Sequence, residues 1–134
     1  MTLLLAGFLV AHGVIHLSYL TPAPPRTAGG PEWPFELQSS WLVTGLQLDP
    51  RLVRSLGTPV VAGTATLLVA AGLATGGWLI PAGWWEGLVL SGAGLSILTL
   101  AFFFHPWLSL GLAIDAALLW AVLVSGWQPI GALR

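Results

Sequence analysis

The chain has 134 residues, of which 56% are hydrophobic and 7% are charged, and its mean hydropathy is +0.88. Soluble domains carry about 25% charged residues, so four Lys and Arg with five Asp and Glu are too few to cover a water-exposed surface. Lipid must therefore be the main solvent. The net charge of -1 gives no basic patch for nucleic acid, and zero cysteines exclude disulfides and thiolate chemistry.

Four apolar segments predict membrane-spanning helices, at roughly residues 2–20, 59–80, 84–104 and 106–127. Each has about the 20 residues that a helix needs to cross the hydrocarbon layer. The first segment has no Lys or Arg at its start, so we expect it to be retained rather than removed as a signal peptide. Short connections between the last three segments require antiparallel neighbours. The sequence therefore predicts an all-α protein: a four-helix, up-down transmembrane bundle formed by one domain over residues 1–134.

Residues 21–57 form the one long predicted loop, between the first and second helices. It begins with TPAPPRTAGGPEWP, which is too rich in proline and glycine to be helical. The amphipathic stretch FELQSSWLVTGLQL suits the headgroup layer, and a short helix is expected to start after Asp49 and to end at Gly57. Its aromatic residues either anchor the loop at the interface or fold back as a lid; they are Trp33, Phe35 and Trp41.

The few basic residues predict the orientation of the chain. The loop side of the bundle carries Arg26, Arg51 and Arg54, whereas the opposite side carries only Arg134. The positive-inside rule then places the loop in the cytoplasm and both termini outside the cell membrane.

Ionisable side chains inside the segments define a candidate site. His12 and His16 share one helix face because they are four residues apart, and Tyr19 extends that face. His12 lies about 12 Å from the loop-side end of its helix, and Asp115 lies about 13 Å from the same side of the membrane. Since an unpaired carboxylate facing lipid is costly, we predict that these two side chains form a hydrogen bond or ion pair. His16 lies about 6 Å nearer the loop side, within possible reach of His105.

These residue types predict a ligand- or proton-binding site made of His12, His16 and Asp115, with His105 and Tyr19 at its loop-side mouth. Histidine and aspartate chains serve as proton relays within membranes. Imidazole and carboxylate groups also bind zinc, iron or copper, and two histidines can hold haem. A metal would therefore use His12, His16 and Asp115. HGVIH lacks the glutamate of the HExxH zinc motif, however. The alternative is a hydrogen bond that only fixes helix packing.

Small residues at regular spacing predict two faces for close helix packing. These faces are Ala62, Thr66 and Ala70 in the second segment, and Gly87, Ser91 and Gly94 in the third. The alternative is a narrow polar path lined by hydroxyl groups, those of Thr64, Ser91, Ser96 and Thr99.

Three classes of function follow. The first is a small integral membrane protein that binds a small molecule, ion or proton at the His/Asp cluster. The second is a non-catalytic accessory subunit, in a homo-oligomer or a larger membrane complex, as the short chain and small-residue faces suggest. The third is a metal- or haem-binding protein, or an enzyme acting on lipid or quinone, which would need the loop to close over the histidines. The sequence identifies neither a cofactor nor a catalytic residue.

Three stretches carry a resemblance to a known group: AHGVIHL (11–17), SSWLVTGLQLDPRLVRSLG (39–57) and FFHPWLSLGLAIDAALL (103–119). They resemble small, uncharacterised bacterial integral membrane proteins with four helices and an HGxIHL-like motif in the first helix. The resemblance implies a four-span bundle and draws attention to His12, Gly13 and His16, but it implies no activity or ligand.

Overall fold

The structure, a computed structural model, describes residues 2–25, 28–30, 32–38 and 40–129. Within these residues the chain is helical and forms no strand. The α-helices are α1 (Thr2–His16), α2 (Trp41–Thr44), α3 (Pro50–Gly76), α4 (Trp85–Phe102) and α5 (Ser109–Leu123). Short 3-10 turns extend α1, α4 and α5; they are η1 (Leu17–Leu20), η2 (Ala82–Trp84) and η3 (Pro106–Leu108).

Four of the helical segments are long and apolar enough to cross a membrane: Thr2–Leu20, Pro50–Gly76, Ala82–Phe102 and Pro106–Leu123. This confirms the number of long apolar helices predicted from the sequence. The chain thus has the helices of a multi-pass membrane protein.

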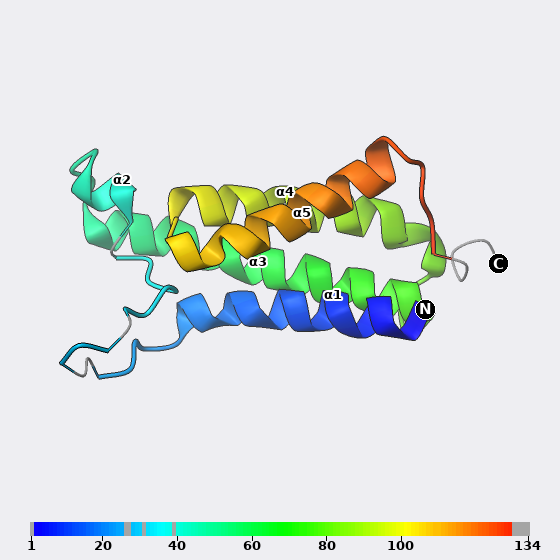
Figure 1. Cartoon of the computed structure of the whole chain (residues 1–134), viewed down its shortest axis with the longest axis horizontal. Coiled ribbons are helices and arrows are strands. Elements are labelled where there is room, and N and C mark those ends of the chain that lie inside the picture. The colour runs from blue at the N-terminus through cyan, green and yellow to red at the C-terminus, as the bar shows by residue number, and fades with distance from the viewer. Residues whose placement is uncertain (1, 26–27, 31, 39, 130–134) are drawn as a thin grey trace.

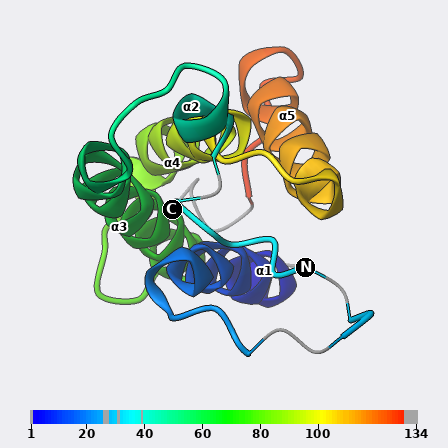
Figure 2. The ribbon, with the colours of Figure 1, turned by 90° about the vertical axis from the view of Figure 1, so that its left-hand side faces the viewer.

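The four long helices lie alongside one another, and each runs opposite to the one before it (Figure 1). The start of α1 and the end of α5 lie at one end of the bundle, and α2 lies at the other. Packing follows the chain: α1 contacts mainly α3, α3 contacts α4, and α4 contacts α5. Viewed from the loop end, the long helices follow one another around the bundle in the order α1, α3, α4 and α5 (Figure 2).

Helix α3 begins earlier than the sequence predicted, because the expected short helix after Asp49 continues directly into the membrane span. The Asp49 carboxylate accepts a hydrogen bond from the Arg51 backbone N–H at 2.8 Å, which caps the helix start. Gly57 does not end a helix. A Cβ there would lie 2.8 Å from the Phe103 ring, so the glycine permits close packing instead. Pro59 lies inside α3, where it removes one backbone hydrogen bond without stopping the helix.

Helix α3 also ends earlier than predicted, at Gly76 rather than at Ile80. Gly77 adopts the left-handed conformation with φ of 70°. Its N–H donates to the Ala74 carbonyl at 3.1 Å, and the next N–H, of Trp78, donates to the Leu73 carbonyl at 2.9 Å. This is the glycine-terminated end common to α-helices. Likewise, α5 ends at Leu123, before the predicted residue 127.

The predicted small-residue faces were wrong for packing within the chain. Gly87 and Gly94 have no atom within 4 Å of an added Cβ, and Ser91 is exposed. In α3, Thr66 is exposed and Ala62 and Ala70 are only half-buried.

Other glycines bring α1 against α3. A Cβ on Gly13 would lie 2.9 Å from the Ala65 carbonyl oxygen, and one on Gly72 would lie 2.7 Å from the Ala6 carbonyl oxygen. Because both obstacles are backbone atoms, these two glycines set how closely the helices approach.

The loop after α1 contacts the bundle through its described aromatic residues. The Trp41 indole N–H donates to the Ala101 carbonyl at 2.8 Å, and the Ser40 hydroxyl donates to the Phe102 carbonyl. The Phe35 ring meets the Tyr19 ring edge-on, with centroids 5.3 Å apart, and Trp33 packs on Phe35 in turn.

Two hydrophobic clusters fill the bundle. We call the one nearer the chain termini the terminal cluster; it contains Leu9, Ala71, Ala74, Trp85, Val89, Ala93, Leu118 and Val122. We call the one beneath the loop the loop cluster; it contains Tyr19, Leu37, Val53, Val61, Leu100, Phe103 and Leu108. In the order of each helix, the residues between the two clusters include His12 and His16 on α1, Ser96 on α4 and Asp115 on α5.

Candidate functional site

His12 and Asp115 contact each other across the bundle. The His12 Nε2 atom lies 2.8 Å from the Asp115 Oδ1 atom, which is hydrogen-bonding distance. Asp115 is fully buried and His12 is 8% exposed. The contact predicted from the matching depth of the two residues is therefore confirmed. This contact joins α1 to α5, the first and the last of the four long helices, whose main packing contacts are with α3 and α4, respectively.

Ser96 extends this pair into a chain of four side chains. Its hydroxyl donates to the Asp115 Oδ2 atom at 2.5 Å, and its oxygen lies 2.9 Å from the His16 Nε2 atom. Ser96 and His16 are 0% and 1% exposed, respectively. The resulting polar chain, His12–Asp115–Ser96–His16, draws its members from α1, α4 and α5.

Ser96 lies at the same depth in the bundle as His12 and Asp115. The serine lies eight residues before Phe104, the predicted loop-side end of its segment. Eight residues of helix correspond to about 12 Å, which matches the depth of the other two side chains. The sequence reasoning named Ser96 only as one hydroxyl of a possible polar path, because serine carries no charge that demands a partner.

The hydrogen bond from Ser96 to Asp115 indicates the hydrogen-bonding roles of Ser96 and His16 in the polar chain. A serine hydroxyl has one hydrogen, and here Ser96 gives it to Asp115. The Ser96 oxygen must then accept from His16, so the His16 Nε2 atom carries a hydrogen. In a neutral imidazole the other nitrogen is an acceptor. That atom, His16 Nδ1, is buried and has no hydrogen-bond partner among the described residues.

Aromatic and hydroxyl groups surround the polar chain. The Phe8 ring lies parallel to the His12 ring with centroids 6.0 Å apart, and the His12 and His16 rings meet edge-on at 5.4 Å. Toward the loop, the hydroxyls of Thr64 and Thr99 lie 3.3 Å apart, and both residues are fully buried. Each threonine also bonds a carbonyl of its own helix, so this pair is satisfied without joining the polar chain.

His105 and Tyr19 lie outside the polar chain. The His105 Nδ1 atom accepts a hydrogen bond from the Trp107 N–H at 3.2 Å, which caps the turn before α5. His16 bonds Ser96 instead of His105, so the predicted contact between these two histidines is not formed. The Tyr19 hydroxyl donates to the Phe103 carbonyl at 3.2 Å, within the loop cluster.

The arrangement does not suit a metal or a haem. Among the described residues, no group of three or more His, Asp or Glu side chains is placed to hold a metal ion. Both Asp115 oxygens and the Nε2 atom of each intramembrane histidine already serve internal hydrogen bonds. A haem held by two histidines needs one imidazole on each face of its plane, whereas His12 and His16 are neighbours on one helix, with ring centroids 5.4 Å apart.

The members of the polar chain are thus linked by hydrogen bonds between side chains that can donate or accept them. No known protein family matches this chain, and no curated protein or solved structure matches it.

Proposed function

We propose that this chain is an integral protein of the cell membrane, in which one domain crosses the bilayer four times as an up-down bundle. The loop between α1 and α3 faces the cytoplasm, and both termini lie outside. The loop-side position of Arg51 and Arg54, at the start of α3, supports this orientation through the positive-inside rule.

We further propose that the function of the polar chain is to bind a proton inside the membrane. The observation that carries this proposal is the continuous hydrogen-bonded sequence of two histidines, one serine and one aspartate, all buried. Within the proposed membrane, ionisable groups of this kind are expensive and are characteristic of proton pathways.

The charge of the cluster supports a proton as the ligand. The span that holds Asp115 has no Lys or Arg, and neither do the spans that hold His12 and Ser96. With both histidines neutral, an ionised Asp115 would leave one uncompensated negative charge in a medium where charge is costly. One proton on the His12–Asp115 pair removes that charge, whether it resides on the imidazole or on the carboxyl group.

Infrared and nitrogen NMR spectra of the protein in lipid nanodiscs will test this proposal. We expect either a protonated carboxyl band that exchanges slowly with D₂O or an imidazolium signal from His12. Asp115→Asn will abolish that signal, because the pair loses its acid. Glu86→Gln is the matched control, since Glu86 is an exposed acid in the first turn of α4.

The contradicting result is equally specific. An ionised Asp115 together with a neutral His12 at neutral pH would show that the pair holds no extra proton.

A second candidate function is that of a non-catalytic accessory subunit, in a homo-oligomer or a larger membrane complex. The outward position of Gly87, Ser91 and Gly94 on α4 favours it, because small residues let a second helix approach closely. We expect Gly87→Leu with Gly94→Leu to dissociate such an assembly in mild detergent, as measured by mass photometry. A wild-type protein that is already monomeric would contradict this function. The described residues of the loop contact Tyr19 and α4 and not the histidines, which does not favour an enzyme acting on lipid or quinone.

A further inference from the structure

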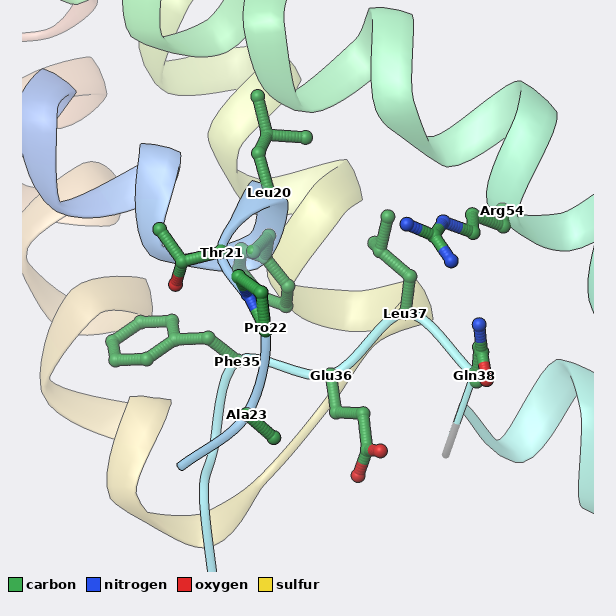
Figure 3. Close-up of a pocket in the computed structure, with 10 residues that line it drawn as sticks. Leu20, Thr21, Pro22, Ala23, Phe35, Glu36, Leu37, Gln38 and Arg54 are labelled. Atoms are coloured by element: carbon green, nitrogen blue, oxygen red, sulfur yellow. The ribbon is translucent and has the colours of Figure 1, made fainter. Parts of the chain in front are cut away.

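A cavity of about 240 Å³ lies at the loop end of the bundle, apart from the polar chain. The end of the first span, the returning loop and α3 meet there (Figure 3). Its walls are formed by Tyr19, Leu20, Thr21, Pro22, Ala23, Phe35, Glu36, Leu37, Gln38 and Arg54.

The polar groups of this cavity are divided between two sides. The side chains of Arg54 and Gln38 lie on the same side, around Leu37, while the Glu36 carboxylate points the other way (Figure 3). In the described part of the chain, the Arg54 guanidinium takes part in no ion pair, and the one such pair is His12 with Asp115. A guanidinium presents a planar fork of N–H donors that matches a phosphate or carboxylate group. The Arg54 side of the cavity is therefore suited to an anion.

The rest of the cavity is suited to an amphiphile. Leu20, Phe35 and Leu37 contribute apolar wall to the cavity. Leu20 is the last residue of the first membrane-spanning segment, so the cavity lies where lipid headgroups meet the hydrocarbon layer. An amphiphilic anion that reaches Arg54 from the bilayer would place its apolar part against these three side chains.

We propose that this cavity binds the phosphate group of an anionic glycerophospholipid. The Arg54 guanidinium donates to two phosphate oxygens, and the Gln38 amide adds a further donor. The volume accommodates a phosphate with its adjoining glycerol, while the acyl chains leave past Leu20 into the bilayer. Because the walls come from η1, the loop and α3, the bound lipid ties the loop to the bundle.

Lipid binding by native mass spectrometry and thermal unfolding in detergent will test this site. The probes are phosphatidylglycerol, phosphatidylcholine and inorganic phosphate, each added to delipidated protein. We expect phosphatidylglycerol to bind and to raise the unfolding temperature most. We expect Arg54→Gln to weaken its binding about tenfold or more, because a charged bidentate hydrogen bond is lost. Arg54→Lys keeps the charge without the fork and should give an intermediate loss.

Arg51→Gln is the matched control, because Arg51 is also exposed on the first turns of α3 but does not line the cavity. It should bind phosphatidylglycerol as the wild type does. Equal weakening by Arg51→Gln and Arg54→Gln would reduce the effect to diffuse surface charge and overturn the proposal. Equal stabilisation by inorganic phosphate would assign the cavity to a free anion instead, and equal stabilisation by phosphatidylcholine would remove the requirement for an anionic lipid.

Discussion

Asp115→Ala is expected to lower the free energy of unfolding by about 3 kcal/mol, because two buried polar groups lose the hydrogen bond that they make to its carboxyl group. Those groups are the His12 Nε2 atom and the Ser96 hydroxyl. His12→Ala should also destabilise the protein, since the Asp115 carboxylate then keeps only the serine bond. The double variant should lose less than the sum of the two, with a coupling energy of about 1–2 kcal/mol. Unfolding by SDS in mixed micelles measures all three values.

His105→Ala combined with Asp115→Ala is the matched control for this cycle. His105 is a histidine of the same chain, but its hydrogen bond is made with Trp107 and not with the polar chain. We therefore expect its effect to add to that of Asp115→Ala within about 0.5 kcal/mol. If the His12 and Asp115 effects were equally additive, the two side chains would not be in contact in the membrane.

Gly72→Ala is the second substitution from which we expect a large effect, about 2 kcal/mol of lost stability. The new Cβ would lie 2.7 Å from both the Ala6 carbonyl oxygen and the Val10 Cγ2 atom. A backbone oxygen cannot move aside by changing rotamer, so α1 itself must shift away from α3. Since α1 carries His12 and His16, the displacement should also weaken the proton signal of the polar chain.

Gly87→Ala provides the comparison for Gly72→Ala, because it is the same change within another membrane helix. No atom lies within 4 Å of the added Cβ at Gly87. Alanine also forms helix more readily than glycine by about 0.5–1 kcal/mol. We expect Gly87→Ala to be neutral or slightly stabilising, in thermal unfolding as well as in SDS. A loss similar to that of Gly72→Ala would mean that close contact between α1 and α3 does not determine stability.

The number of long apolar helices and the His12–Asp115 contact could be predicted because both depend on one-dimensional quantities. Segment length relative to bilayer thickness gives the helices. Residue depth along each helix then pairs the only histidine and aspartate that lie near the middle of their spans. Neither quantity requires knowledge of which face a helix turns to its neighbours.

The helix faces could not be predicted, for a physical reason. A membrane helix is apolar all round, so it lacks the polar stripe that identifies the outer face of a soluble helix. Glycine and serine at Gly87 and Ser91 match the spacing of a packing face as well as Gly72 does, yet they point outward. Tertiary packing alone distinguishes them.

Local rules for helix ends failed at Gly57 and Pro59 for a related reason. Both residue types disfavour a helix interior in isolation. Here Gly57 is buried against Phe103 and Leu37. Because α3 continues through Gly57, it packs against both the loop and the end of α4. The packing gained on that face outweighs the backbone hydrogen bond lost at the proline.

The position of the polar chain between the terminal and loop clusters has a consequence for the membrane around it. Closely packed hydrocarbon on both sides separates the buried acid from each aqueous surface. In the proposed membrane arrangement, this packing leaves no water-filled route past the polar chain, and the bilayer would keep its electrical insulation. On the proposed function, a proton bound to the polar chain would exchange with water only when the helices separate briefly, so its exchange should be slow.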